Sequence, residues 1–236
     1  MENNSFNVTG GVEQITLTKS FMSSVFSWMF FAMAATAVCS YFGQSLVPYY
    51  INPATGGMNA LGWVVLLAPL GLVLLMAARF QKLPYLAMVL LFGLYSVLMG
   101  LSLSFIFFAY TSSSIFKTFA ITAGMFGAMA LVGYTTKTDL TRFGSIMIMG
   151  LVGIIIASLV NMFLRSGMME YIISFIGVLV FTGLTAYDVQ KLKKIGSGLQ
   201  YPDENMRKLV IMGALTLYLD FINLFLFLLR FFGNRR

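Results

Sequence analysis

Seven long blocks of apolar residues, separated by short polar connectors, constrain this chain more than any other feature of its sequence. Each block holds about the 20 helical residues that span a hydrocarbon core. An aromatic content of 15% suits the aromatic belts found at membrane interfaces. The predicted fold class is therefore all-α, a polytopic membrane protein with seven transmembrane helices. The blocks cover residues 20–47, 60–78, 84–111, 115–134, 143–164, 171–192 and 208–232.

The composition excludes several classes of protein. Only 10% of the residues are charged, whereas a soluble domain carries roughly 25%, so a soluble enzyme is not expected. The absence of histidine excludes catalytic triads, imidazole metal ligands and histidine pH switches. Cys39 is the only cysteine, which excludes an intrachain disulfide and a zinc cluster. We expect no enzymatic activity and no cofactor.

The positive charges lie between the apolar blocks, and this is how a membrane protein fixes its orientation. The net charge of +7 is thus no sign of nucleic acid, which needs basic residues clustered on one face. We expect residues 1–19 to be a polar cytoplasmic tail and residues 20–236 to be the seven-helix transmembrane domain, with the C-terminus outside. Arg235 and Arg236 count against this orientation. The segments expected in the cytoplasm hold Lys19, Arg79, Lys82, Lys137, Arg142, Lys191, Lys193, Lys194, Arg207 and Lys208, and the opposite side holds Lys117 and Arg165.

Two aspartates lie inside apolar blocks. Asp188 is near the end of the sixth block, and Asp220 is near the middle of the seventh. An unpaired carboxylate at such depth costs at least a few kcal/mol, so it usually faces a partner or water and has a function. One alternative is that Asp220 only hydrogen-bonds a neighbouring helix. Its helix face is small and polar at its centre. The residues that recur on this face at three- and four-residue steps are Gly213, Thr216, Asp220, Asn223 and Phe227.

If Asp188 and Asp220 meet, the two carboxyl groups share one proton and titrate as a coupled pair. Loss of that proton or gain of a second one would bias a helix packing that has two states. Calcium prefers six to eight oxygen ligands, so these two aspartates would bind it weakly and transiently, as a leak requires. The polar residues expected to support such a pathway are Asn161, Asn223, Thr216, Tyr187 and Tyr218.

The depths of the two aspartates set a geometric condition. If the seventh span starts near Arg207, Asp220 lies about 20 Å deep, at 1.5 Å per residue. If the sixth span ends near Gln190, Asp188 lies only about 3 Å from its end by the same rise. The pair can be level if the sixth helix continues through at least Lys193, before Gly196 stops it. The carboxyl groups should then lie within about 3 Å of each other.

Two blocks carry stripes of small residues, which let helices approach closely in lipid. We interpret them as ordinary bundle packing. The stripes are Ser96, Gly100 and Ser104 in the third block, and Ala120, Gly124 and Ala128 in the fourth.

Four segments resemble the transmembrane Bax inhibitor motif family, in particular its bacterial YccA-like and YetJ-like members. The match of the last block is specific because it combines Asp, Asn, Arg and an aromatic pattern in one span. The segments are LYLDFINLF (217–225), LLRFFG (228–233), AYDVQ (186–190) and TTKTDLT (135–141).

This resemblance implies six helices in two three-helix layers around a central C-terminal helix. It also implies a pH-sensitive calcium leak that is gated by a hydrogen-bonded aspartate pair, here Asp188 and Asp220. A basic residue near the cytoplasmic end of the second span should contact the sixth-span aspartate, and Arg79 is the first candidate, with Lys82 second. The expected location is the bacterial cytoplasmic membrane, and the expected partners are calcium ions and the lipid bilayer.

Two other functions are compatible with parts of the sequence. A presenilin-like intramembrane aspartyl protease also carries Tyr-Asp on its sixth span and an aspartate on its seventh. That family needs a glycine two residues before the second aspartate, where this chain has Tyr218, and a later Pro-Ala-Leu segment that is absent here. A membrane-embedded regulator that binds a protein partner, such as a membrane protease or a stress-survival factor, leaves no motif to search for.

The distribution of Lys and Arg predicts the orientation of the chain. A reporter that works only in the cytoplasm should be inactive when fused to Arg236 and active when inserted at Gly198, in the 191–207 connector. Activity of the fusion at Arg236 would contradict either the number of spans or the cytoplasmic N-terminus.

Overall fold

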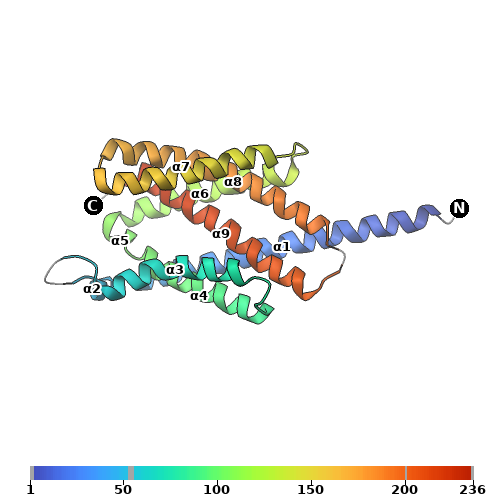
Figure 1. The fold of residues 1–236 in the computed structure, drawn as a ribbon, viewed down its shortest axis with the longest axis horizontal. Coiled ribbons are helices and arrows are strands. Elements are labelled where there is room, and N and C mark those ends of the chain that lie inside the picture. Colours follow the sequence, from blue (N-terminus) through green and yellow to red (C-terminus); the bar gives the residue numbers. More distant parts are fainter. Residues whose placement is uncertain (1–2, 53–55, 200, 235–236) are drawn as a thin grey trace. The chain divides into compact units, whose positions relative to one another are not determined.

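The structure is a computed structural model that describes residues 3–52, 56–199 and 201–234, with side chains from Gln14 onward. These residues form helices and no strand, apart from an isolated bridge between Ile51 and Met58. Figure 1 shows the helices along the chain. They are α1 (Asn3–Gly43), the 3-10 helix η1 (Gln44–Leu46), α2 (Val47–Tyr50), α3 (Ala60–Arg79), α4 (Tyr85–Leu103), α5 (Ile106–Ala109), α6 (Ser112–Thr135), α7 (Thr141–Leu164), α8 (Gly167–Ser197) and α9 (Glu204–Phe232).

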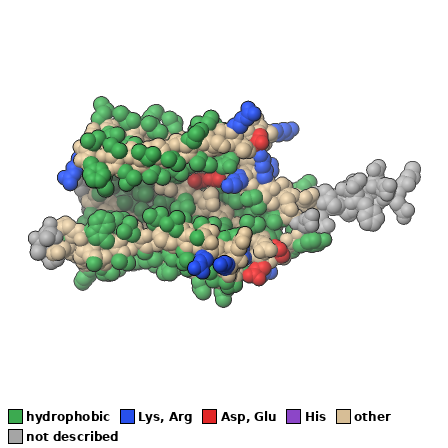
Figure 2. Space-filling model, viewed as in Figure 1, with side chains coloured by type: hydrophobic (Ala, Val, Ile, Leu, Met, Phe, Trp, Pro, Cys, Tyr) green, Lys and Arg blue, Asp and Glu red, His purple; other side chains and the backbone are tan. Residues whose placement is uncertain are grey.

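Among the described residues, seven helical segments are long and apolar enough to cross a membrane, which confirms the predicted number of spans. The chain is a multi-pass membrane protein. Hydrophobic side chains cover most of the helix surface visible in Figure 2, as expected for helices in contact with lipid. The segments are Gln14–Tyr50, Ala60–Arg79, Tyr85–Ala109, Ser112–Thr135, Thr141–Leu164, Gly167–Ser197 and Glu204–Phe232.

Local sequence signals explain several helix ends. Asn59 accepts a hydrogen bond from the Gly62 amide (2.9 Å) at the start of α3, and Asp203 accepts one from the Met206 amide (2.7 Å) at the start of α9. Both side chains satisfy a backbone N–H that the first helical turn leaves unpaired. At its other end, α7 stops at Arg165, whose backbone is left-handed (φ 51°).

The helices depart from the predicted blocks in three places. α1 begins at Asn3, so the expected polar tail is helical over most of its length. The third block is interrupted after Leu103, where α4 ends, and resumes as α5. α8 continues to Ser197, five residues beyond the predicted end of the sixth block, so the condition that it be helical through Lys193 is confirmed. Arg235 and Arg236, which count against the expected orientation, lie outside the described residues.

The chain divides into two compact units. The first comprises Met1–Ala109 and Gly196–Leu215, and the second comprises Tyr110–Ile195 and Thr216–Arg236. In the first unit α1 packs against α4, which also packs against α3. A Cβ on Gly100 of α4 would lie 2.7 Å from the Thr36 carbonyl oxygen of α1, and Thr36 Oγ1 donates to the Ser96 carbonyl oxygen (2.8 Å). The small residues of the third block therefore permit close helix packing, as predicted.

The second unit contains α6, α7, α8 and the C-terminal part of α9. A Cβ on Gly133 of α6 would collide with the Ala186 backbone of α8, so these two helices touch at a position without a side chain. The predicted packing stripe of α6 is wrong. Ala120, Gly124 and Ala128 are all exposed, and a Cβ on Gly124 would meet nothing within 4 Å. The stripe failed as a predictor because small residues permit close packing without requiring it.

Gly133→Val should destabilise the protein by about 1–3 kcal/mol, because the added side chain overpacks the α6–α8 contact. Gly124→Val places the same residue on the exposed face of the same helix and is the matched control. Thermal unfolding of the detergent-purified variants measures the effect. Equal midpoints for the two variants would contradict the contact between Gly133 and Ala186.

Candidate functional site

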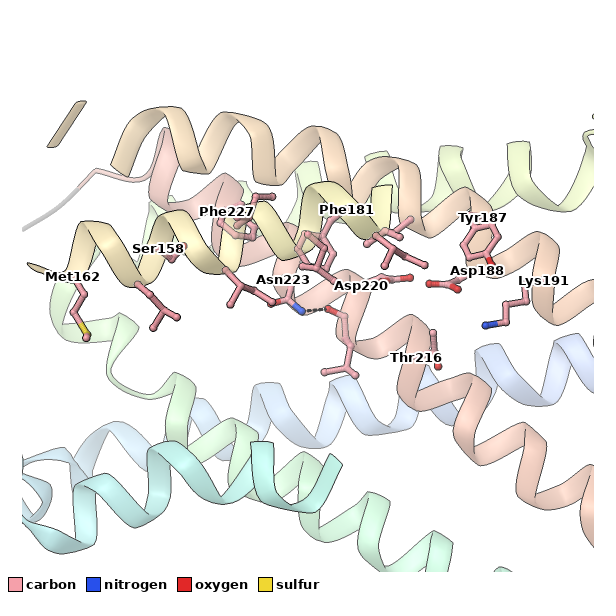
Figure 3. Close-up of a pocket in the computed structure, with 17 residues that line it drawn as sticks. Ser158, Met162, Phe181, Tyr187, Asp188, Lys191, Thr216, Asp220, Asn223 and Phe227 are labelled. Atoms are coloured by element: carbon pink, nitrogen blue, oxygen red, sulfur yellow. Dashed lines mark hydrogen bonds between the residues drawn. The ribbon is translucent and has the colours of Figure 1, made fainter. Parts of the chain in front are cut away.

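The last two helices bring the two intramembrane aspartates together. Asp188 of α8 and Asp220 of α9 point their carboxyl groups toward one another (Figure 3) and interact through a side-chain hydrogen bond. Asp220 is buried (5% exposed) and Asp188 is partly buried. The helical continuation of α8 past Lys193 makes this possible, because it places Asp188 nine residues before the helix ends rather than at its last turn.

The aspartates line a cavity of about 740 Å³ between α7, α8 and α9. Its walls are mostly apolar, and α7 contributes one polar side chain, Ser158. Most of the polar groups gather around the aspartates (Figure 3). The polar and charged lining residues are Ser158, Tyr187, Asp188, Lys191, Thr216, Asp220 and Asn223.

Three of the five predicted pathway residues line this cavity, namely Tyr187, Thr216 and Asn223. Asn223 lies one turn after Asp220, and its amide donates to the Leu219 carbonyl oxygen (2.8 Å) within α9. The other two do not line the cavity. Asn161 accepts a hydrogen bond from the Ser166 amide (3.0 Å) at the end of α7, and Tyr218 is fully buried.

Lys191 lines the cavity, although the sequence predicts only that it lies in a cytoplasmic segment. It lies one helical turn after Asp188, lines the same cavity and acts on Asp188 through its charge. Its Nζ lies 5.9 Å from the centre of the Tyr187 ring. The i, i+3 spacing of Asp188 and Lys191 places the two side chains on one helix face. This spacing is the feature of the sequence that could have predicted that Lys191 lies near Asp188.

The basic residues expected near Asp188 belong to the first unit. Arg79 is the last residue of α3, and Lys82 lies in the following turn, where its amide donates to the Arg79 carbonyl oxygen (2.9 Å). Both side chains are exposed. Contact of either residue with Asp188 stays a prediction.

A second finding is a clamp between α8 and the connector from α6 to α7. Two residues after Asp188, the buried Gln190 donates from Nε2 to the Thr138 carbonyl oxygen (2.7 Å). Its Oε1 accepts from the Leu140 amide (2.8 Å). One side chain thus satisfies a donor and an acceptor of a connector that has no regular structure of its own.

Two lysines extend the clamp. Lys193 Nζ donates to the Tyr134 carbonyl oxygen (2.8 Å), and Lys194 forms an exposed ion pair with Asp139 (2.7 Å). The hydrogen bond from Lys194, followed by those from Thr141, holds the pKa of Asp139 well below its usual range. The ion pair therefore persists below the pH at which a free aspartate protonates, and it is lost as pH falls through the lowered pKa.

The described residues hold no group of three or more His, Cys, Asp or Glu side chains placed to bind a metal ion. The cavity therefore offers two carboxyl groups, with hydroxyl and amide oxygens around them. Such a site can share a proton, and it can meet a cation that keeps most of its water.

Seven apolar helices, the last two of which carry facing aspartates, define a polytopic membrane protein with a buried acidic site. The chain belongs to the family described as inhibitor of apoptosis-promoting Bax1, which matches residues 18–236. The resemblance to the Bax inhibitor motif family is thereby confirmed.

Relatives in three bacteria extend over nearly the whole chain. The inner membrane protein YbhL of Escherichia coli K12 is 48% identical over 219 residues, which cover 92% of this chain and 93% of YbhL. An uncharacterised protein of Borreliella burgdorferi is 44% identical over 98% of both chains. The uncharacterised protein RP147 of Rickettsia prowazekii is also 44% identical, over 92% of this chain and 91% of its own.

Gln190→Leu should destabilise the protein by about 1–3 kcal/mol, because it leaves the Leu140 amide and the Thr138 carbonyl group without their partner. Lys194→Ala removes an exposed ion pair and should have a much smaller effect. Thermal unfolding measures both effects, and trypsin cleavage at Lys137 reports whether the connector loosens. Unchanged stability and cleavage in Gln190→Leu would contradict the clamp.

Proposed function

We propose that this protein is a pH-sensitive calcium leak channel of the bacterial cytoplasmic membrane, gated by the Asp188–Asp220 pair and without enzymatic activity. The observation that carries the proposal is the meeting of the two carboxyl groups at a cavity between membrane-spanning helices. Membership of the Bax inhibitor family supports it, because the resemblance of the two aspartate segments implies this activity.

The proposed gate works through the proton that the two carboxyl groups share. Two carboxylates this close in a low-dielectric site do not both ionise without cost, so they hold one proton between them. Loss of the proton leaves two repelling charges, and gain of a second one breaks the shared hydrogen bond. Either change weakens the contact between α8 and α9 and favours another packing of the two helices.

The oxygens around the pair suit a cation that passes through rather than one that is stored. Asp188 and Asp220 are supported by Tyr187, Thr216 and Asn223, which together fall short of a complete calcium shell of six to eight oxygens. The ion would keep part of its water at this site. Weak binding of this kind is what conduction requires.

Orientation and location complete the proposal. With the N-terminus in the cytoplasm, the connector between α8 and α9 is cytoplasmic and the basic end of α8 faces the anionic inner leaflet. A bacterial cytoplasmic membrane agrees with the name of the E. coli relative, an inner membrane protein. Two three-helix layers around α9, and a contact of Arg79 or Lys82 with Asp188, belong to the same proposal.

Asp188→Asn and Asp220→Asn should each change the pH dependence of calcium flux, because an amide keeps the shape of the side chain but cannot titrate. The measurement uses purified protein in liposomes that contain a calcium dye, with flux recorded across a range of pH. Asp203→Asn is the matched control, because an asparagine at the start of α9 can still accept the Met206 hydrogen bond.

Wild-type pH profiles in both variants would contradict the gate. Absence of flux from the wild-type protein at every pH would contradict the leak itself and favour the alternative, a regulator that acts by binding a membrane-protein partner.

A further inference from the structure

The cavity is much larger than a hydrated cation needs. Its volume of about 740 Å³ lies in the range of small-molecule sites, roughly 300–1,000 Å³. The α7 wall runs from Ile148 to Met162, which is about 21 Å of helix at 1.5 Å per residue. Apart from Ser158, its lining side chains are aliphatic or Met. A calcium ion would use none of this apolar surface.

The polar groups of the cavity are concentrated around the aspartates. In Figure 3, Asp188, Asp220 and Lys191 gather at one end, while Ser158 and Met162 lie toward the other. The side chain of Asp220 is only 5% exposed. Its Oδ2 is shielded from solvent and has no hydrogen-bond partner among the described residues. The one proton that the pair shares can engage only one oxygen of Asp220, so the carboxyl group keeps a buried acceptor without a donor, which is costly. This acceptor indicates a ligand that donates a hydrogen bond.

We propose that the cavity binds an amphiphilic organic cation, with a primary or secondary ammonium group at Asp220 and an apolar body along the α7 wall. The ammonium group supplies the missing donor, and the hydrocarbon covers the apolar lining. The proposed calcium leak uses the aspartates of this cavity but not its apolar α7 wall.

The charges of the site favour an ammonium group over an anion. Lys191 acts on Asp188 from the adjacent helical turn, which leaves Asp220 as the carboxyl group without a protein cation beside it in this cavity. The lining residues from α7 carry no charge, and α9 contributes only Asp220. A carboxylate or phosphate head group would be repelled by the aspartates and would leave Oδ2 of Asp220 unsatisfied.

The test uses a photoreactive probe, a linear alkyl primary amine with a diazirine at the end of its chain, added to the purified full-length protein. With the amine at Asp220, the diazirine should label residues 155–162 of α7, as located by mass spectrometry of peptides. The matched probe is the same molecule with its amine acetylated, which removes the charge but keeps the chain. Labelling by the amine should exceed labelling by the amide by about tenfold, as loss of one charge-assisted hydrogen bond implies.

Two pairs of variants locate the two halves of the ligand. Asp220→Asn should lower labelling by about tenfold, for the same reason, while Asp203→Asn should leave it unchanged. Ser158→Phe fills the cavity and should abolish labelling, whereas Ser145→Phe places the same residue on the exposed face of α7, outside the cavity. Gel filtration verifies that each variant is folded. If Asp220→Asn does not fold, the loss of labelling in Ser158→Phe, compared with Ser145→Phe, is the deciding result.

Equal labelling by the amine and the amide would show simple hydrophobic insertion and would overturn the proposal. Labelling that is insensitive to both Asp220→Asn and Ser158→Phe would overturn it as well. The measurement needs no ion flux, so a protein that conducts no calcium can still show the expected labelling, and a calcium leak can exist without it.

Discussion

Carboxyl groups inside a bundle of apolar helices are the feature on which the rest of this structure depends. An ionised aspartate in such surroundings costs several kcal/mol unless it has a partner, and here Asp188 and Asp220 are partners of each other. The two carboxyl groups can meet only if α8 and α9 keep a fixed axial position and a fixed distance relative to each other. The glycine contacts, the clamp at the end of α8 and the polar end of the cavity all serve that requirement.

α8 is the element that the second unit is built around. It touches α6 where Gly133 meets the Ala186 backbone, α7 where Gly144 meets the Tyr187 ring, and α9 where Gly177 meets the Phe227 ring. At each of these positions a Cβ would collide with the neighbour, so the residue without a side chain sets the distance between the helices. Close packing of this kind holds helices together in lipid, where the hydrophobic effect does not.

Much of this arrangement could be predicted from the sequence. The seven spans follow from hydropathy alone, and the two aspartates were conspicuous because charged residues are rare in such segments. The clamp could not be predicted, because Gln190 pairs with backbone groups 50 and 52 residues away and backbone groups leave no pattern in a sequence. The cavity was missed for a related reason, since a space between helices is a property of their packing. Asn161 lies outside the cavity and accepts the Ser166 amide at the end of α7, a capping role that any amide near a helix end can take.

The clamp and the Gly133 contact have a joint mechanical consequence. They lie on either side of Asp188, at Ala186 and at Gln190, and both tie α8 to the α6–α7 hairpin. The backbone that carries Asp188 is therefore positioned from both sides by the α6–α7 hairpin, so the place of this carboxyl group depends on that hairpin as well as on α9.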